Sequence, residues 1–281
     1  MPGCTKQPQK NEIIKAKIMN KKIQTSIQSI IVIAILSSLF IINRYNYLLF
    51  HSLVELFSII IAYGIFIISL HSKRFMKNSY LLFLGIAYFF IATIDLLHTL
   101  AYKGINIFIG YGTNLPTQLW ITARYIEGGT IFLACMLINK NISFTKTFII
   151  YFTITVTLIF AIFEGIFPAC FIENKGLTLF KKLSEYFIAS ILALSILLIC
   201  KSKKKFTPYI FNLLITSIIF TIIAEFFFTF YIKVYDTSNL LGHYFKLASF
   251  YLIYKAIIET GFDKPFGLLF KNMKENEQKL I

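Results

Sequence analysis

Residues 47–70 read YLLFHSLVELFSIIIAYGIFIISL, an apolar run in which His51 and Glu55 are the only His, Asp, Glu, Lys or Arg residues. A hydrocarbon core about 30 Å thick takes roughly 20 helical residues to cross. Because this run is at least that long and holds only two such groups, we expect it to form a transmembrane helix.

Seven further runs of similar character bring the expected number of transmembrane helices to about eight. The eight runs extend approximately from Ser26 to Ile42, Tyr47 to Leu70, Tyr80 to Leu100, Leu119 to Ile138, Lys146 to Phe167, Leu183 to Cys200, Pro208 to Tyr231 and Leu240 to Ile258. Apolar residues make up 57% of the chain and the mean hydropathy is +0.71, more than a soluble fold of 281 residues can bury. The sequence therefore predicts an all-α fold, a polytopic membrane helix bundle embedded in the lipid bilayer.

The basic residues predict how this bundle is oriented. Of the Lys and Arg residues in the connections and tails, 19 fall on the side of the two termini and six on the other side. Cytoplasmic loops accumulate these residues, so we expect a multi-pass protein of the cell (plasma) membrane with both termini cytoplasmic. The formal charge of +15 does not indicate nucleic-acid binding, because the cations form short clusters between apolar runs. Two outward loops, Ala101 to Gln118 and Pro168 to Lys182, are expected to form short ordered lids or turns.

Ten ionisable side chains inside the predicted helices share the outer half of the membrane. A charged side chain at such a depth costs a few kcal/mol, so each one needs a partner or a purpose. The ten are His51, Glu55, Asp95, His98, Arg124, Glu127, Glu164, Glu225, His243 and Lys246. Independent pairs would have no reason to choose one half across six helices, so the sequence predicts one polar pocket open to the outside.

Five of these residues, His51, Glu55, Asp95, His98 and His243, form the predicted ligand or metal pocket. Helical spacing places His51 and Glu55 on one helix face, and Asp95 and His98 on one face of the next helix. Imidazoles from three helices, His51, His98 and His243, suit a divalent transition metal or a haem. We expect their ring centres to lie within roughly 10 Å of one another. The alternative is that each histidine serves as a plain helix-to-helix hydrogen bonder.

The other residues are predicted to build the pocket wall or to form ion pairs. They are Trp120, Arg124, Glu127, Glu164, Glu225 and Lys246. Arg124 and Glu127 have the spacing of a structural ion pair, and Lys246 is expected to neutralise Glu225 or a bound anion. Trp120 alternatively belongs to an interfacial aromatic belt. Five carboxylates against two cations leave an excess of three negative charges when the histidines are neutral, which protonation or a bound cation would resolve.

Three motifs resemble the third type of MASE, the membrane-associated sensor domains of bacteria and archaea. They are LLHTLAYKG at Leu96 to Gly104, LPTQLW at Leu115 to Trp120, and ETGFDKPF at Glu259 to Phe266. The resemblance extends over about residues 45 to 270. It implies a sensory input module, normally placed before PAS domains, a histidine kinase core or a diguanylate cyclase, and it implies no particular ligand.

The chain departs from the pattern of that family after the last predicted helix. We expect a basic cytoplasmic tail at 1–25, a transmembrane sensor domain at 26–260, and a cytoplasmic exit or signalling helix at 261–281, with the output domain absent. The expected partner, implied by the resemblance, is a cytoplasmic kinase, cyclase or PAS-type output domain. The sequence is also compatible with a homodimer.

Three functions compete at this stage. The leading one is a membrane receptor module without catalytic activity, because no soluble segment is long enough to fold as an enzyme domain. The second is a zinc-dependent intramembrane hydrolase resembling ceramidases and adiponectin-receptor relatives, although Leu247 stands where their paired histidine would follow His243. The third is a secondary transporter, for which polar groups near the membrane midplane would be expected.

Overall fold

The computed structural model describes residues 6–73, 79–105, 107–138, 140–230 and 237–258, and helices make up most of this part of the chain. The helices are α1 (Lys6–Tyr45), α2 (Tyr47–Ser72), α3 (Ser79–Leu100), α4 (Asn114–Met136), α5 (Phe144–Phe163), α6 (Leu179–Lys201), α7 (Pro208–Phe230) and α8 (Thr237–Ile258). A 3-10 turn, η1 (Lys203–Lys205), and two short strands, β1 (Phe171–Ile172) and β2 (Gly176–Leu177), complete the described elements. The predicted all-α membrane bundle is confirmed.

Five helical stretches are long and apolar enough to cross a membrane by length and composition. They are Tyr47–His71, Tyr80–Leu100, Phe144–Phe163, Leu179–Lys201 and Pro208–Thr229, and α1 adds a shorter apolar stretch, Ser29–Tyr45. α4 and α8 are less apolar because each carries ionisable residues, among them Arg124 in α4 and Lys246 in α8. These two helices can cross a bilayer only if neighbouring helices shield such side chains from lipid.

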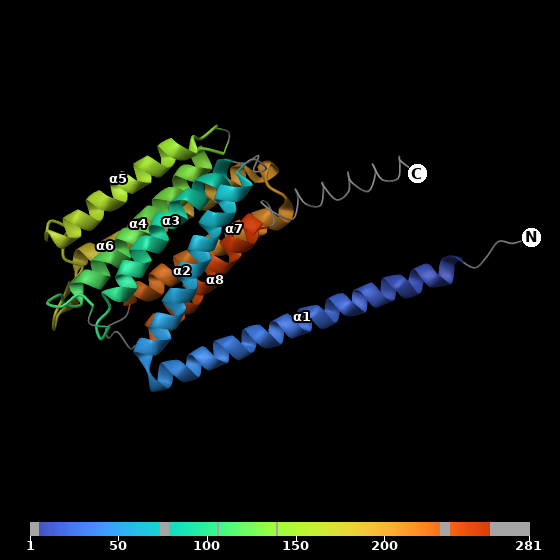
Figure 1. Cartoon of the computed structure of the whole chain (residues 1–281), viewed down its shortest axis with the longest axis horizontal. Coiled ribbons are helices and arrows are strands. Elements are labelled where there is room, and N and C mark those ends of the chain that lie inside the picture. Colours follow the sequence, from blue (N-terminus) through green and yellow to red (C-terminus); the bar gives the residue numbers. More distant parts are fainter. Residues whose placement is uncertain (1–5, 74–78, 106, 139, 231–236, 259–281) are drawn as a thin grey trace, which may run out of the picture. The chain divides into compact units, whose positions relative to one another are not determined.

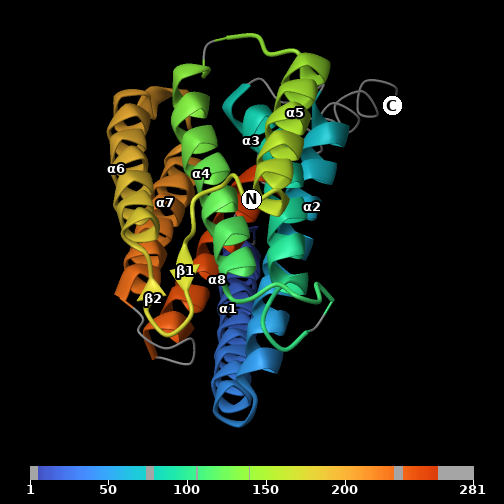
Figure 2. The same cartoon turned by 90° about the vertical axis from the view of Figure 1, so that its left-hand side faces the viewer.

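α4 is shielded in this way, because it lies in the middle of the bundle that begins at His51. It packs against α3, α5 and α6, and most of its side chains are buried. Figure 1 shows α2 to α8 running side by side, and Figure 2 shows α4 between α6 and α5. A helix surrounded by protein can carry polar residues that a lipid-facing helix could not.

The connections at one end of this bundle are tied to the start of α4, and we call this end the hairpin end because it carries β1 and β2 (Figure 2). The strands pair antiparallel, with Phe171 opposite Leu177. Oδ1 of Asn114 accepts hydrogen bonds from the backbone N–H groups of Cys170 (2.8 Å) and Phe171 (3.0 Å). Nε2 of Gln118 donates to the carbonyl of Phe167 at 2.9 Å. The connection is therefore ordered, as the sequence predicts for a lid or turn.

α5 ends at Phe163, before the predicted Phe167, and a glycine is the cause. Gly165 has φ +72°, the left-handed conformation that commonly ends helices. The backbone N–H groups of Ile166 and Phe167 then both donate to the carbonyl of Ala161. The chain therefore leaves the helix before Glu164, which is exposed as its C-terminal cap.

The opposite half of the bundle is held by apolar packing and by hydroxyl groups. α2 and α3 approach closely at Gly85, where a Cβ would overlap the side chain of Ser69. Between α7 and α8, the Ser249 hydroxyl lies 2.9 Å from that of Ser217 and 2.7 Å from that of Thr221. Small residues and shared hydroxyls are how membrane helices pack closely without charge.

The described chain divides into two compact units, one ending at Phe50 and the other beginning at His51. α1 belongs to the first unit and begins well before the predicted start at Ser26. Residues 1–5 of the predicted tail and the predicted exit segment 261–281 lie outside the described residues.

Candidate functional site

Glu55 on α2 is completely buried and lies against two residues of α8. Its Oε2 is 2.6 Å from Nζ of Lys246, and its Oε1 is 3.2 Å from Nδ1 of His243. His243 and Lys246 are three positions apart, so they share one face of α8. A single carboxylate thus joins the second helix to the last one.

A second ion-pair group joins α3 to α4. Nη2 of Arg124 donates to both carboxylate oxygens of Asp95, at 3.0 and 2.8 Å, and its Nη1 donates to Glu127. The hydroxyl of Tyr88 donates to the other oxygen of Glu127 at 3.1 Å. All four side chains are at most 1% exposed. Hydrogen bonds between an ionised donor and an ionised acceptor are stronger than those between neutral groups, so this buried guanidinium is held firmly.

Lys246 connects the two groups into one network. Its Nζ lies 3.3 Å from Oδ2 of Asp95 as well as close to Glu55. The indole of Trp120 lies beside both cations, with its ring centre 4.4 Å from Nζ of Lys246 and 4.9 Å from Cζ of Arg124. The network therefore spans α2, α3, α4 and α8, and its cations are held by carboxylates and an aromatic face.

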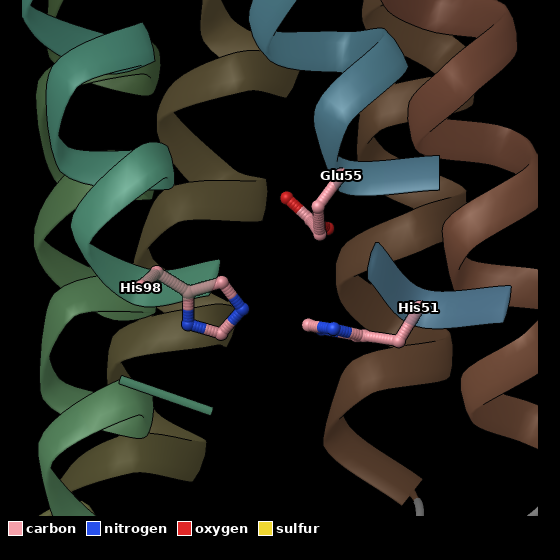
Figure 3. Close-up of side chains that lie close together, drawn as sticks. All are labelled: His51, Glu55 and His98. Carbon is pink, nitrogen blue, oxygen red and sulfur yellow. The ribbon is translucent and has the colours of Figure 1, made fainter. Parts of the chain in front are cut away.

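Three histidines lie next to this network. The ring centre of His51 is 5.4 Å from that of His98 and 5.0 Å from that of His243. Figure 3 shows His51, Glu55 and His98 pointing toward one another from α2 and α3. One donor atom from each of these three residues lies within 4.8 Å of the others. The predicted meeting of the imidazoles is present in the structure.

The histidines line a cavity of about 60 Å³ at the hairpin end. Its wall includes the exposed loop residue Lys103 together with Thr113, so the cavity extends from the loops to the imidazoles. Trp120 and Phe228 supply an apolar side. A water molecule needs about 10–15 Å³ of such space, so the cavity holds a few waters or a small ligand.

Sequence reasoning missed three residues of this region. Tyr102, assigned above to a loop, stacks on His51 with ring centres 3.8 Å apart. Lys181 and Glu185 on α6 are each 1% exposed and form an ion pair, and Nζ of Lys181 also donates to the carbonyl of Phe228 at 3.1 Å. The predicted helix began only at Leu183, whereas α6 begins at Leu179. The overlooked signal was Thr178, whose side chain accepts from the backbone N–H of Lys181 as a helix N-cap.

The structure brings nine of the ten predicted ionisable residues into the buried interior. The exception is Glu164, which is exposed for the reason given above and is not part of the pocket wall. Lys246 pairs with Glu55 and Asp95, not with Glu225 as expected. Glu225 is 2% exposed and lines a small space beside Arg124 and Trp120.

Trp120 is 6% exposed and lines the cavity, so it is not a residue of an interfacial aromatic belt.

The count of buried charges also differs from the one predicted from the sequence. Among the residues that the structure describes, the buried carboxylates are Glu55, Asp95, Glu127, Glu185 and Glu225, and the buried cations are Arg124, Lys181 and Lys246. Five against three leaves two excess negative charges when the histidines are neutral.

Outside the helices, the hairpin carries a carboxylate whose titration is shifted. Oε1 of Glu173 accepts from the hydroxyl of Thr113 at 2.9 Å and from its backbone N–H at 3.3 Å. These two hydrogen bonds hold the pKa of Glu173 below its usual range. Burial raises the pKa of the nearby Cys170 thiol to about 12, so this thiol is not a reactive nucleophile.

A comparison with protein families identifies the chain over most of its length. Residues 42–265 match the family model of a membrane-associated sensor domain, MASE3. No curated protein and no solved structure matches the chain. The matched region contains α2 to α8 and every residue of the site just described. The chain therefore belongs to the MASE3 family of membrane-associated sensor domains.

Proposed function

We propose that the cavity at the hairpin end binds a small ligand, ion or metal from outside the cell, and that α8 carries the resulting change to a cytoplasmic signalling partner. The main support for this proposal is the position of α8. α8 holds the pocket residue His243 in its second turn and the network residue Lys246 about one turn later, and it continues to Ile258 at the opposite end. The same rigid element thus touches the cavity and leads to the chain's C-terminal segment.

The contacts around α8 indicate how binding would be transmitted. Lys246 lies between Glu55 of α2 and Asp95 of α3, so a ligand that alters the charge on either carboxylate alters the force on α8. Charged pairs in a dry interior interact strongly, so a small change in charge has a large effect there. The hydroxyl contacts of Ser249 hold the middle of α8 against α7 and would move with it.

The distribution of basic residues supports an outward-facing cavity. On the eight-helix topology that the sequence predicts, 19 Lys and Arg residues fall on the side of the two termini and six on the other side. One of those six, Lys181, is a buried ion-pair residue and not a loop cation, which makes the asymmetry of the loops larger. By the positive-inside rule both termini are cytoplasmic and the hairpin end faces outward.

A chimera tests this proposal. Residues 1–270 are joined to a soluble histidine kinase core, and autophosphorylation is measured in membranes. We expect His243→Gln to change kinase output about fivefold or more, a typical allosteric coupling. His71→Gln is the matched control, because His71 is an exposed histidine at the opposite end of α2. A reporter fused after residue 281 checks the orientation independently.

Two outcomes would contradict the proposal. Equal kinase output from the two variants, with equal amounts of protein in the membrane, would mean that the cavity does not control signalling. Hydrolysis of lipid or peptide by the purified chain, lost on His98→Ala but kept on His71→Ala, would favour the zinc hydrolase.

A further inference from the structure

The tautomer of His98 is fixed by its backbone partner. Nδ1 of His98 lies 2.7 Å from the carbonyl oxygen of Pro116. A carbonyl only accepts hydrogen bonds, so Nδ1 carries the proton and, in the neutral ring, Nε2 presents a lone pair. The side chain is 5% exposed, and Nε2 has no hydrogen-bond partner among the described residues. Metal-binding histidines have this arrangement, with one ring nitrogen donating to a backbone carbonyl and the other facing the metal.

Two further donors lie on the side to which Nε2 of His98 points. His51 and Glu55 each offer one ligand atom, and these atoms and that of His98 lie within 4.8 Å of one another (Figure 3). Ligands about 2.1 Å from a tetrahedral metal are about 3.4 Å apart. The three ligand atoms are at most 4.8 Å apart, so small side-chain rotations would bring them to the spacing that a metal requires. The three side chains therefore lie close to a metal-binding arrangement without any ion present.

We propose that His51, Glu55 and His98 bind a divalent transition-metal ion, and that His243 orients Glu55 for this role. Two imidazoles and one carboxylate suit Zn²⁺ and its first-row neighbours, whereas Ca²⁺ and Mg²⁺ prefer oxygen ligands throughout. Nδ1 of His243, 3.2 Å from Oε1 of Glu55, is placed to hold the carboxylate. This inference names the ligand class of the same cavity and in that respect rests on the proposed function.

The surrounding charges favour a dication. When all the buried carboxylates of the described residues are ionised and the histidines are neutral, they exceed the buried cations by two charges, and a divalent ion would offset that excess. Lys246 opposes a cation, but it contacts Oε2 of Glu55 and is shared with Asp95, so Oε1 still has a lone pair for a metal. The cavity of about 60 Å³ leaves room for water or a small ligand in an open coordination position and is too small for a haem.

The test uses the full chain purified in detergent and stripped with a chelator. Zn²⁺ binding is measured by competition with a metal indicator, and Co²⁺ is used as a spectroscopic probe whose visible bands report its ligand geometry. We expect one Zn²⁺ per chain, and we expect His98→Ala to raise the dissociation constant at least about tenfold. His51→Phe should act similarly while keeping an aromatic ring against Tyr102, and His71→Ala should leave binding unchanged. Thermal unfolding of each apo variant shows that it is folded.

The outcomes separate this inference from the proposed function. Absence of Zn²⁺ and Co²⁺ binding by folded protein overturns the metal site, as does equal binding by His98→Ala and His71→Ala. In either case a kinase chimera that still responds to His243→Gln leaves the sensor function standing with another ligand. Metal binding as expected, with a chimera that does not respond to Zn²⁺ or to His98→Ala, leaves the metal site standing and contradicts the proposed function.

Discussion

The two ends of the bundle bury polar groups in opposite ways. Every buried side chain of Asp, Glu, His, Lys or Arg among the described residues lies between the hairpin end and the middle of the bundle, where the network ends at Glu127. Toward the other end, the buried polar side chains carry hydroxyls, as at Ser69, Thr147 and Ser195. One half is therefore a charged interior and the other an uncharged one.

The two halves differ in what their buried polar groups require from the surrounding helices. A hydroxyl can be satisfied within its own helix, as the Ser195 hydroxyl is by donating to the carbonyl of Ile191 at 2.8 Å. A buried charge needs an oppositely charged partner, and for Arg124 one such partner, Asp95, lies on another helix. Because replacing buried ion pairs by apolar residues is often neutral or stabilising, stability alone does not account for the charged half.

The largest effect on stability is expected from removing Arg124, the cation that pairs with both Asp95 and Glu127. Arg124→Leu leaves Asp95 and Glu127 buried without their shared partner. Breaking a buried ion pair by removing one partner costs about 3–5 kcal/mol. We expect a large loss of thermal stability in detergent, measured by scanning fluorimetry. Lys255→Leu, the removal of an exposed cation from α8, should have little effect.

A second pair of substitutions examines the uncharged half. Gly85→Ala places a methyl group in the space occupied by Ser69, and such overpacking costs about 1–3 kcal/mol. Gly129→Ala in α4 meets no atom within 4 Å and should be neutral or stabilise by about 0.5–1 kcal/mol, because alanine favours helix. Chemical unfolding of both variants checks the difference. Equal effects would mean that α2 and α3 are not closely packed at Gly85.

The sequence predicts the helices and the main site residues because both depend on regular spacing. Apolar runs of membrane length mark the helices, and spacings of three or four residues place His51 with Glu55 and Asp95 with His98. Depth in the membrane then predicts that residues from different helices meet. The ring distances from His51 to His98 and His243 agree with this reasoning.

Helix ends and partner choice could not be predicted in the same way. Gly165 ends α5 and exposes Glu164, and Thr178 begins α6 early enough to bury Lys181. Both effects depend on single residues whose backbone conformation the apolar pattern does not report. The pairing of Lys246 with Glu55 depends on how α8 is rotated against α2, which no spacing within one helix determines.

The smallest expected effect concerns the hairpin end of the charged half. There, the side chain of Glu173 accepts a hydrogen bond from Thr113 and so connects the hairpin to the start of α4. Its hydrogen bonds favour the charged form, so its folded pKa lies below the unfolded value of about 4.3. A carboxylate with a lowered folded pKa contributes stability above the unfolded value and loses it as the pH falls through the folded one. Hydrogen exchange of residues 171–177, corrected for intrinsic rates, should therefore increase on acidification below about pH 4.3.

Glu173→Gln should remove this pH dependence, because glutamine keeps an acceptor oxygen for Thr113 but has no charge to lose. Glu164→Gln is the matched control, since it changes the other exposed carboxylate of this connection without touching the hairpin. If the control variant alone loses the pH dependence, the titrating group is not Glu173. If no variant does, the hydrogen bonds of Glu173 do not stabilise the hairpin, and contacts such as those of Asn114 with Cys170 and Phe171, which do not depend on pH, hold it.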